Sequence, residues 1–212
     1  MASYLGAYKN CAADRVKKFH RAVVSVLMQS FENWELIIIS DGCQQTIDET
    51  ASYKDPRIKL SPIAKQKIWS GGPRNRGIAN AKGEYILYLD TDDMFGQDHL
   101  LIIDAGIYYA SLGLFISLNR FLPHKTPKNP DWVYFNDYIY STQFLERQCI
   151  VEKQGHHGTG NVCHRRDIDV YWNDHTYLHD FYFVKALRSI SNGVQIPTPQ
   201  YYVCHIPELY DI

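Results

Sequence analysis

The sequence has little of what marks secreted or membrane-spanning proteins. Its five cysteines are scattered and none are spaced as CxxC, which favours free thiols in a reducing compartment over a disulfide framework or a zinc site. No run reaches the roughly 18 apolar residues that cross a bilayer, and the first ten residues lack the pattern of a signal peptide. We therefore expect a soluble, cytoplasmic protein without a transmembrane segment, although peripheral membrane association stays compatible with this composition.

The net charge is also small. A formal net charge of −1 gives no electrostatic argument for a nucleic-acid or anionic-membrane partner. The nine histidines form no HExxH pattern, so zinc catalysis of that kind is unsupported. The chain is instead rich in tyrosine, with 16 residues, and tyrosine suits half-wet clefts that bind sugars or nucleotides.

Apolar patterns alternate along the first half of the chain. We predict strands at residues 2–8, 35–40, 57–63 and 85–89, helices at 14–30 and 46–54, and a Gly-rich loop with a short helix within 71–83. This β-α-β-α-β-α-β order predicts an α/β protein with an open, mostly parallel sheet. Ligands bind such sheets at the carboxyl ends of the strands, where Asn10, Asp41 and Asp90 all lie.

The second half is less regular but shows no linker that would separate two cores, so we predict one domain over residues 1–212. Because prolines interrupt residues 194–206, any strand there is expected at a sheet edge. The other expected elements are a helix capped by Asp98, strands within 131–142, a Gly-rich loop and strand in 155–166, and a helix at about 180–191.

The strand at 85–89 ends in three carboxylates, Asp90, Asp92 and Asp93. Like charges a few ångströms apart raise one another's pKa, so this cluster is costly unless a cation lies beside it. Asp oxygens suit hard ions such as Mg²⁺ or Mn²⁺, which keep several waters and bind nucleotide phosphates. The alternative is a solvated turn in which Asp92 or Asp93 caps a short helix.

Four motifs occur in order: GAYKN at 6–10, a strand ending in SDG at 40–42, GGPRNRG at 71–77 and YLDTDD at 88–93. As a set they resemble the inverting glycosyltransferases of family 2, from residue 6 to residue 100. The resemblance implies an α/β fold of GT-A type, three-layer α/β/α with a mostly parallel, Rossmann-like central sheet. It also implies metal-dependent transfer from a nucleotide-sugar, UDP-linked by preference, to a glycan or glycolipid acceptor, as in polysaccharide biosynthesis. Residues 1–100 would bind the nucleotide-sugar and residues 101–212 the acceptor.

The resemblance assigns roles to the matching residues. Asp41 would accept the N3–H of uracil, Tyr8 would lie near the base or ribose, and Arg74 would face the nucleotide. In the DxD pair, Asp92 would bind Mn²⁺ or Mg²⁺ and Asp90 would face the ribose. The alternative for Arg74 is a surface charge at the helix start. Two departures concern the nucleotide fit, since the first motif lacks the family's usual proline and the second strand ends in one acid where many relatives have two.

The family supplies its catalytic base as an acid at the start of a late helix, often in a Glu-Asp pair. The matching stretch is TYLHDFYFVKAL at 176–187, where His179 replaces the usual Glu and Asp180 remains. We therefore predict Asp180 as the base, in the ionised form that a helix N-terminus favours. Asp174 is the second choice, and the alternative for Asp180 is a helix cap.

Four further residues have weaker assignments. His205 lies near the position of a late metal-binding His in several GT-A enzymes, and its alternative is a buried or edge-strand histidine. His156 and His157 fall in the stretch that lines the sugar and acceptor pocket in the family, or else are exposed loop residues. Trp69 would stack on a base or sugar, or belong to the core.

Two other functions stay open. One is a nucleotide- or carbohydrate-binding module without turnover, which the missing Glu before Asp180 and the short second half allow. The other is a haloacid dehalogenase-like phosphatase, because LDTDD resembles the nucleophile motif DxDx[TV]. That motif, however, has Thr or Val where this chain has Met94, and it normally lies near the N-terminus.

Overall fold

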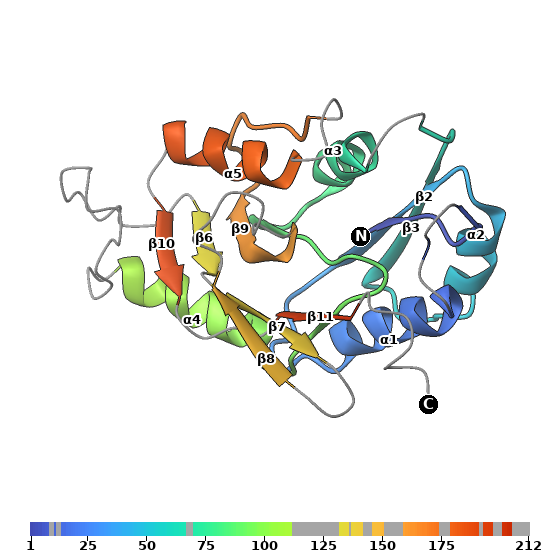
Figure 1. The fold of residues 1–212 in the computed structure, drawn as a ribbon, viewed down its shortest axis with the longest axis horizontal. Helices are drawn as coiled ribbons and strands as arrows, with labels where there is room; N and C mark the ends of the chain where they lie inside the picture. The colour runs from blue at the N-terminus through green and yellow to red at the C-terminus, as the bar shows by residue number, and fades with distance from the viewer. Residues whose placement is uncertain are drawn as a thin grey trace.

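The structure is a computed structural model that describes residues 1–8, 11, 14–66, 70–111, 132–135, 137–141, 146–150, 159–173, 179–190, 193–196 and 201–204. Within these residues the strands form one three-stranded and two four-stranded sheets, with helices around them (Figure 1). No helix in the described part is both long and apolar enough to cross a membrane.

Three of the four strands predicted in the first half form a parallel sheet, whereas the fourth, at 85–87, pairs antiparallel in another sheet, so the prediction is wrong for that strand. Strand β2 (Leu36–Asp41) lies between β1 (Ala2–Ser3) and β3 (Ile58–Ile63), and both pairings are parallel. The sequence of β2, LIIISD, is an almost continuous apolar run, as expected for a strand covered on both faces. β1 is shorter than the predicted strand at 2–8, so residues 4–8 are a loop beside the ends of β2 and β3.

Helices cover both faces of this sheet. Helix α1 (Arg15–Leu27) shares one core with Ile38, while Gly77 of helix α3 (Gly71–Asn80) packs toward Ile39. Ile38 and Ile39 point to opposite faces because side chains alternate along a strand. The sheet is therefore the middle of three layers, as the GT-A interpretation predicts. The residues that α1 buries follow one helical face: Lys18, Phe19, Ala22, Val23 and Val26.

The Gly-rich segment is a helix from its first residue. The sequence predicts a loop before Pro73, whereas α3 already begins at Gly71. Pro73 is tolerated there because the first four N–H groups of a helix have no intrahelical acceptor, so the missing donor of proline costs little. The consequence is that Arg74 projects from the first turn of a regular helix. The helix between β2 and β3 is α2 (Gln44–Thr50).

The other strands form two mixed sheets, in the orders β10-β6-β9-β4 and β5-β11-β7-β8. Among the described strands, the parallel pairs here are β10 with β6 and β11 with β7, and β4 pairs antiparallel with β9. The bounds are β4 (Tyr85–Leu87), β5 (Met94–Phe95), β6 (Trp132–Phe135), β7 (Asp137–Ser141), β8 (Glu146–Ile150), β9 (Val162–Arg165), β10 (Gly193–Ile196) and β11 (Tyr201–Val203).

The prediction that any strand in residues 194–206 lies at a sheet edge is right for one of the two strands there. β10 lies at the edge of its sheet, as predicted. β11 lies inside its sheet, between β5 and β7, so the prediction is wrong there. The reason is that β11 begins after Pro199, and its three residues can all donate to a neighbouring strand.

A second core lies beneath helix α5 (His179–Ile190). Trp172 and Phe183 stack with ring centroids 4.0 Å apart, and Tyr88 meets Trp172 edge-on at 4.8 Å. These rings join α5 to the strand that leads into the carboxylates, because Tyr88 lies two residues before Asp90. Helix α4 (His99–Ser111) and the short helix η1 (Thr159–Asn161) complete the described elements.

Two histidines are buried in these cores. His99 stacks on Phe95 with centroids 4.2 Å apart, and His164 Nε2 lies 2.6 Å from the Tyr88 hydroxyl. His164 Nδ1 lies 2.8 Å from the carbonyl oxygen of Arg165, which fixes the ring with its proton on Nδ1. Burial lowers the pKa of His99 to about 3 and that of His164 to about 4. Both rings are therefore neutral in the folded protein at pH 7.

We expect acid to destabilise the protein through these rings. Because the folded pKa lies below the unfolded one, the neutral ring contributes stability above about pH 6.5 that is lost as the pH falls. Lowering the pH from about 7 to about 5 should reduce the free energy of unfolding by about 2 kcal/mol for each histidine. Urea unfolding at these two pH values should show a loss that is smaller by this amount in His99→Leu than in wild type. An unchanged acid loss in His99→Leu would contradict the assignment.

Candidate active site

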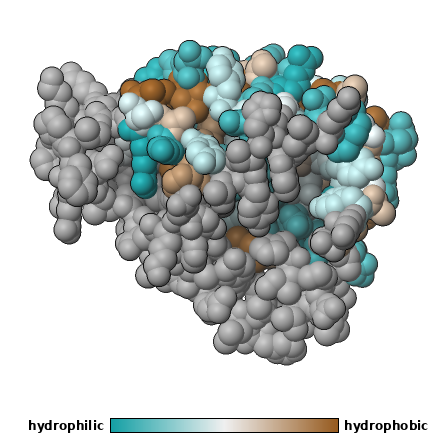
Figure 2. All heavy atoms as spheres, turned by 45° about the horizontal axis from the view of Figure 1, so that its top comes forward, coloured by the Kyte–Doolittle hydropathy of each residue, from teal (hydrophilic) through white to brown (hydrophobic). Residues whose placement is uncertain are grey.

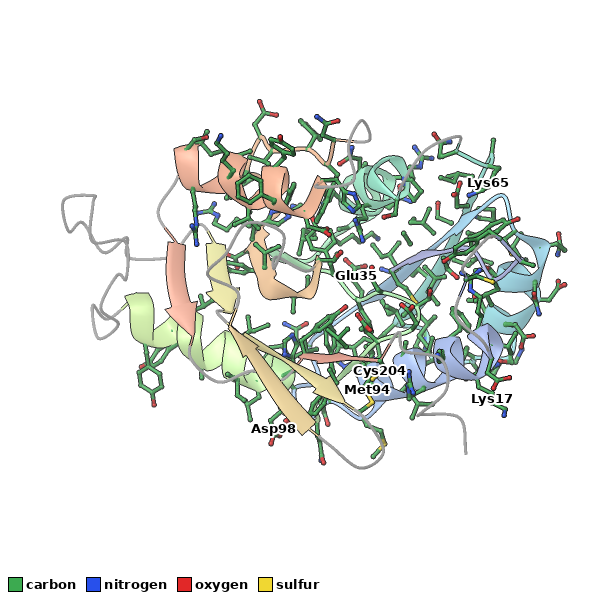
Figure 3. All side chains as sticks on the ribbon, viewed as in Figure 1. Lys17, Glu35, Lys65, Met94, Asp98 and Cys204 are labelled. Atoms are coloured by element: carbon green, nitrogen blue, oxygen red, sulfur yellow. The ribbon has the colours of Figure 1, made fainter. Side chains whose placement is uncertain are left out.

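The three carboxylates after β4 do not point the same way. Asp93 is buried, with an exposed fraction of 5%, and both its oxygens accept hydrogen bonds from the strand β11 region. Its Oδ2 accepts from the Tyr201 hydroxyl at 2.7 Å and its Oδ1 from the Cys204 N–H at 2.8 Å. In Figure 3, Cys204 lies near Met94, the residue after Asp93. Burial, followed by the charges of Asp92 and Asp90, raises the pKa of Asp93 well above its usual range.

Asp90 belongs to a network that also contains the predicted base. Arg74 Nη2 donates to Asp90 Oδ1 at 2.9 Å and to Thr159 Oγ1 at 2.7 Å. The Thr159 hydroxyl in turn donates to Asp180 Oδ1 at 3.0 Å, and Arg74 Nη1 lies 3.6 Å from the same oxygen. The structure thus brings together three residues that the sequence singled out, Arg74, Asp90 and Asp180. Sequence reasoning missed Thr159, although it lies in the GHHGTGN stretch, because a single threonine in a Gly-rich segment has no pattern of its own.

Asp180 is the second residue of α5 and is mostly buried. Burial raises the pKa of this carboxyl, while the charges of Arg74 and His179 act in the opposite direction. His179 Nε2 lies 3.3 Å from Asp180 Oδ1. Desolvation is the largest of these effects, so the pKa of Asp180 is raised overall. The role of Asp180 as the base stays a prediction. A carboxylate with a raised pKa is a stronger base, which suits proton abstraction.

Arg74 is buried rather than a surface charge, so that alternative is wrong. Its guanidinium lies 4.5 Å above the Trp172 ring, a cation–π arrangement. The neighbouring Asn75 holds the Trp172 backbone with two hydrogen bonds, donating to its carbonyl at 3.0 Å and accepting from its N–H at 2.9 Å. These contacts attach α3 to the segment before α5 and fix Arg74 between the two carboxylates.

Asp41 lies at the end of β2, as predicted, but it is engaged within the chain. Lys65 Nζ donates to its Oδ2 at 2.5 Å and the Gln66 N–H to its Oδ1 at 2.7 Å. Figure 3 shows Lys65 beyond the end of the parallel sheet. Gly42 has φ +62°, and a Cβ there would lie 2.5 Å from Lys65 Cβ, so glycine is required for this approach. Each oxygen of Asp41 keeps a second lone pair that a nucleobase N–H can use.

Tyr8 lies in the loop that follows β1, and β1 runs parallel to β2, which ends at Asp41. Its ring is 56% exposed, and the Arg15 guanidinium lies 4.6 Å from the ring centroid. An exposed aromatic face of this kind suits stacking with a base. Of the other predicted site residues, Asn10, Trp69, His156, His157, Asp174 and His205 lie outside the described residues.

Asp90 and Asp92 are the residues that fit a divalent cation. Both are partly exposed in one tight turn, and their negative charges raise the pKa of the adjacent Asp93, so the field there favours a cation. Two carboxylates and water suit Mg²⁺ or Mn²⁺, whose other ligands would come from a diphosphate. In the described residues, no three His, Cys, Asp or Glu side chains are grouped so as to hold a metal alone.

Residues 10–103 match the family model described as glycosyl transferase family 2, a stretch that includes Asp41, Arg74 and the carboxylates after β4. The part of the chain from residue 10 to residue 103 is therefore similar to glycosyltransferase family 2. The motif LDTDD is thus part of a family 2 pattern, which removes the support for the phosphatase alternative.

The relatives that this chain matches extend well beyond it. An uncharacterized glycosyltransferase of Rickettsia felis is 40% identical over 91 residues, which is 42% of this chain and 15% of the relative. The putative colanic acid biosynthesis glycosyl transferase WcaA of Escherichia coli is 32% identical over 142 residues, 60% of this chain and 50% of the relative. The chain therefore spans half or less of the length of these relatives.

The fold of this chain is shared with a solved structure. The crystal structure of S. aureus TarS 1–349 in complex with UDP superposes with a TM-score of 0.67 at 17% identity, covering 91% of this chain and 58% of TarS. The likeness extends beyond residue 103, where the family match ends, and so includes described elements of the second half.

Proposed function

We propose that the chain transfers a sugar from a UDP-linked nucleotide-sugar to a glycan or glycolipid acceptor, with inversion and with a divalent cation. The observation that carries this proposal is the network that joins Arg74, Asp90 and Asp180 through Thr159. It links the carboxylates after β4, where a diphosphate would bind, to a buried carboxylate on a different element. TarS has been solved with UDP and with UDP-GlcNAc, which supports a UDP-sugar as the donor.

In this mechanism the oxygen of an acceptor hydroxyl attacks the anomeric carbon from the side opposite the nucleotide. Asp180 accepts the proton of that hydroxyl during the attack. Thr159 and Arg74 hold one oxygen of Asp180 and leave the other for the acceptor. Asp92 would hold the divalent cation, which would neutralise the leaving diphosphate, and Asp90 beside it would face the ribose. Tyr8 and Asp41 would contact the base.

The setting proposed for this reaction is the synthesis of a cell-surface polysaccharide or glycolipid in the cytoplasm. WcaA and the succinoglycan biosynthesis protein ExoW of Rhizobium meliloti are named for polysaccharide synthesis. Figure 2 shows hydrophobic and hydrophilic residues interspersed on the described part of one face.

A nucleotide screen with Mn²⁺ tests the donor class. Thermal shift and calorimetry should show selective binding of UDP over GDP and CDP, and UDP-sugars should be hydrolysed slowly in a Mn²⁺-dependent reaction. Asp92→Ala should abolish the hydrolysis, whereas Asp48→Ala, an exposed change on α2, should not. Tight UDP binding without hydrolysis or transfer to any candidate acceptor would favour the binding-module alternative. A preference for GDP or CDP would overturn the role of Asp41.

A further inference from the structure

Tyr201 contacts both sides of the candidate active site. It lies on β11, opposite Phe95 in the antiparallel pairing with β5, and only 3% of it is exposed. No sequence pattern marks it, because it is one of 16 tyrosines in the chain and lies 108 residues from Asp93. Neither the nucleotide motif nor the predicted base includes it.

The hydroxyl of Tyr201 binds the carboxylate turn at two points. It donates to Asp93 Oδ2 at 2.7 Å and accepts from the Asp90 N–H at 3.3 Å. The turn also closes on itself, since the Asp93 N–H donates to the Asp90 carbonyl at 3.2 Å. The hydroxyl therefore fixes both ends of the segment that carries Asp92.

The ring of Tyr201 faces η1. Gly160 packs so closely on it that a Cβ on Gly160 would overlap the ring carbons. Phe95 contacts the same ring edge-on, with centroids 5.8 Å apart. The ring is thus held between Phe95 and Gly160 and cannot shift without moving one of them.

Gly160 follows Thr159, whose hydroxyl accepts from Arg74 and donates to Asp180. One continuous series of contacts therefore runs from the turn of Asp90 to Asp93, through the hydroxyl and ring of Tyr201, to Gly160, Thr159 and Asp180. It spans the two sides between which a donor and an acceptor would meet.

We propose that Tyr201 is a positioning residue that sets the placement of the carboxylate turn relative to Asp180. This inference rests on the proposed function for its catalytic consequence. It does not need Tyr201 to touch the substrate, because the residue acts through Asp90, Asp93 and Thr159. Loss of the hydroxyl should release the ring from the turn, so that its packing on Gly160 loosens as well.

Tyr201→Phe removes only the hydroxyl, and Tyr53→Phe is the matched control. Tyr53 makes its hydrogen bond to His20, away from the site. For Mn²⁺-dependent hydrolysis of a UDP-sugar we expect Tyr201→Phe to lower kcat at least about 30-fold with KM changed less than about threefold, a loss of orientation rather than of binding. Thr159→Val combined with Tyr201→Phe should be no slower than the slower single variant, because the two act in one series. Two results would overturn the proposal. One is a loss of kcat in the double variant equal to the product of the two single losses, and the other is a kcat of Tyr201→Phe equal to that of Tyr53→Phe.

Hydrogen exchange of the protein without substrate gives a second measurement that does not depend on activity. Tyr201→Phe should speed exchange in residues 90–95 and also in 159–162, whereas Tyr53→Phe should change neither segment. If Tyr201→Phe speeds exchange in residues 90–95 but not in 159–162, Tyr201 does not couple the two segments and the proposal is wrong. If wild type hydrolyses no UDP-sugar, the proposed function fails, and the exchange experiment still decides whether Tyr201 joins the two segments.

Discussion

Asp180→Asn is expected to lower the turnover of a UDP-sugar by about 10³-fold, the middle of the range for loss of a general base. Donor binding should stay within about threefold, because the Asn oxygen can still accept from Thr159 as Asp180 does. The variant should fold, since it replaces a buried carboxyl whose pKa is raised by desolvation with a neutral amide. Steady-state kinetics and calorimetry with UDP measure the two effects separately.

The pH dependence gives an independent check on the same residue. The base acts in its ionised form, so wild-type activity should fall as the pH drops through the raised pKa of Asp180, at a higher pH than for an ordinary carboxyl. Asp167→Asn, an exposed change beside Arg165, should keep the wild-type profile and rate. If Asp180→Asn retained more than about a tenth of the activity, the base would have to be sought elsewhere, with Asp174 first.

Arg74→Met should lower the free energy of unfolding at pH 7 by about 3 kcal/mol. Removing one partner of a buried ion pair costs 3–5 kcal/mol because it leaves an uncompensated charge. The lower end applies here because the Asp90 side chain is 38% exposed and water can solvate it. Met retains a flexible chain over Trp172, so lost packing contributes little. Urea unfolding followed by tryptophan fluorescence measures the change.

Acid should rescue this variant. Part of the lost stability comes from ionised Asp180, whose pKa is raised, so the loss should shrink as the pH falls and this carboxyl binds a proton. Arg74→Met combined with Asp180→Asn should be more stable than Arg74→Met alone, and Arg74→Lys should lose less because it keeps the charge. An Arg74→Met variant as stable as wild type would show that the guanidinium is not needed to hold the two carboxylates.

The parts of the fold that are local in sequence could be predicted. The apolar run of β2 and the helical face of α1 carry their structure in their own residues, and both lie where expected. The convergence of Arg74, Asp90 and Asp180 was predicted only through the resemblance to family 2. The residues around Asp180 do not by themselves show whether it is a catalytic base or a helix cap.

The parts that depend on distant contacts could not be predicted. Antiparallel pairing of β4 with β9 joins segments about 80 residues apart, and no local pattern specifies it. Tyr201 and Thr159 are common residue types whose importance comes only from what they touch. The engagement of Asp41 by Lys65 depends on the positive φ of Gly42, which an Asp-Gly turn allows but does not require.

The attachment of Asp93 to β11 has a consequence for how the chain is made. β1–β3 and helices α1–α3 all come from the first 80 residues, so that sheet can form while the ribosome is still translating the rest. Cys204 follows Asp93 by 111 residues, a delay of roughly 6–22 s at about 5–20 residues per second. During that interval Asp93 has neither of its donors, so the nascent chain must keep this carboxylate hydrated until residues 201–204 emerge.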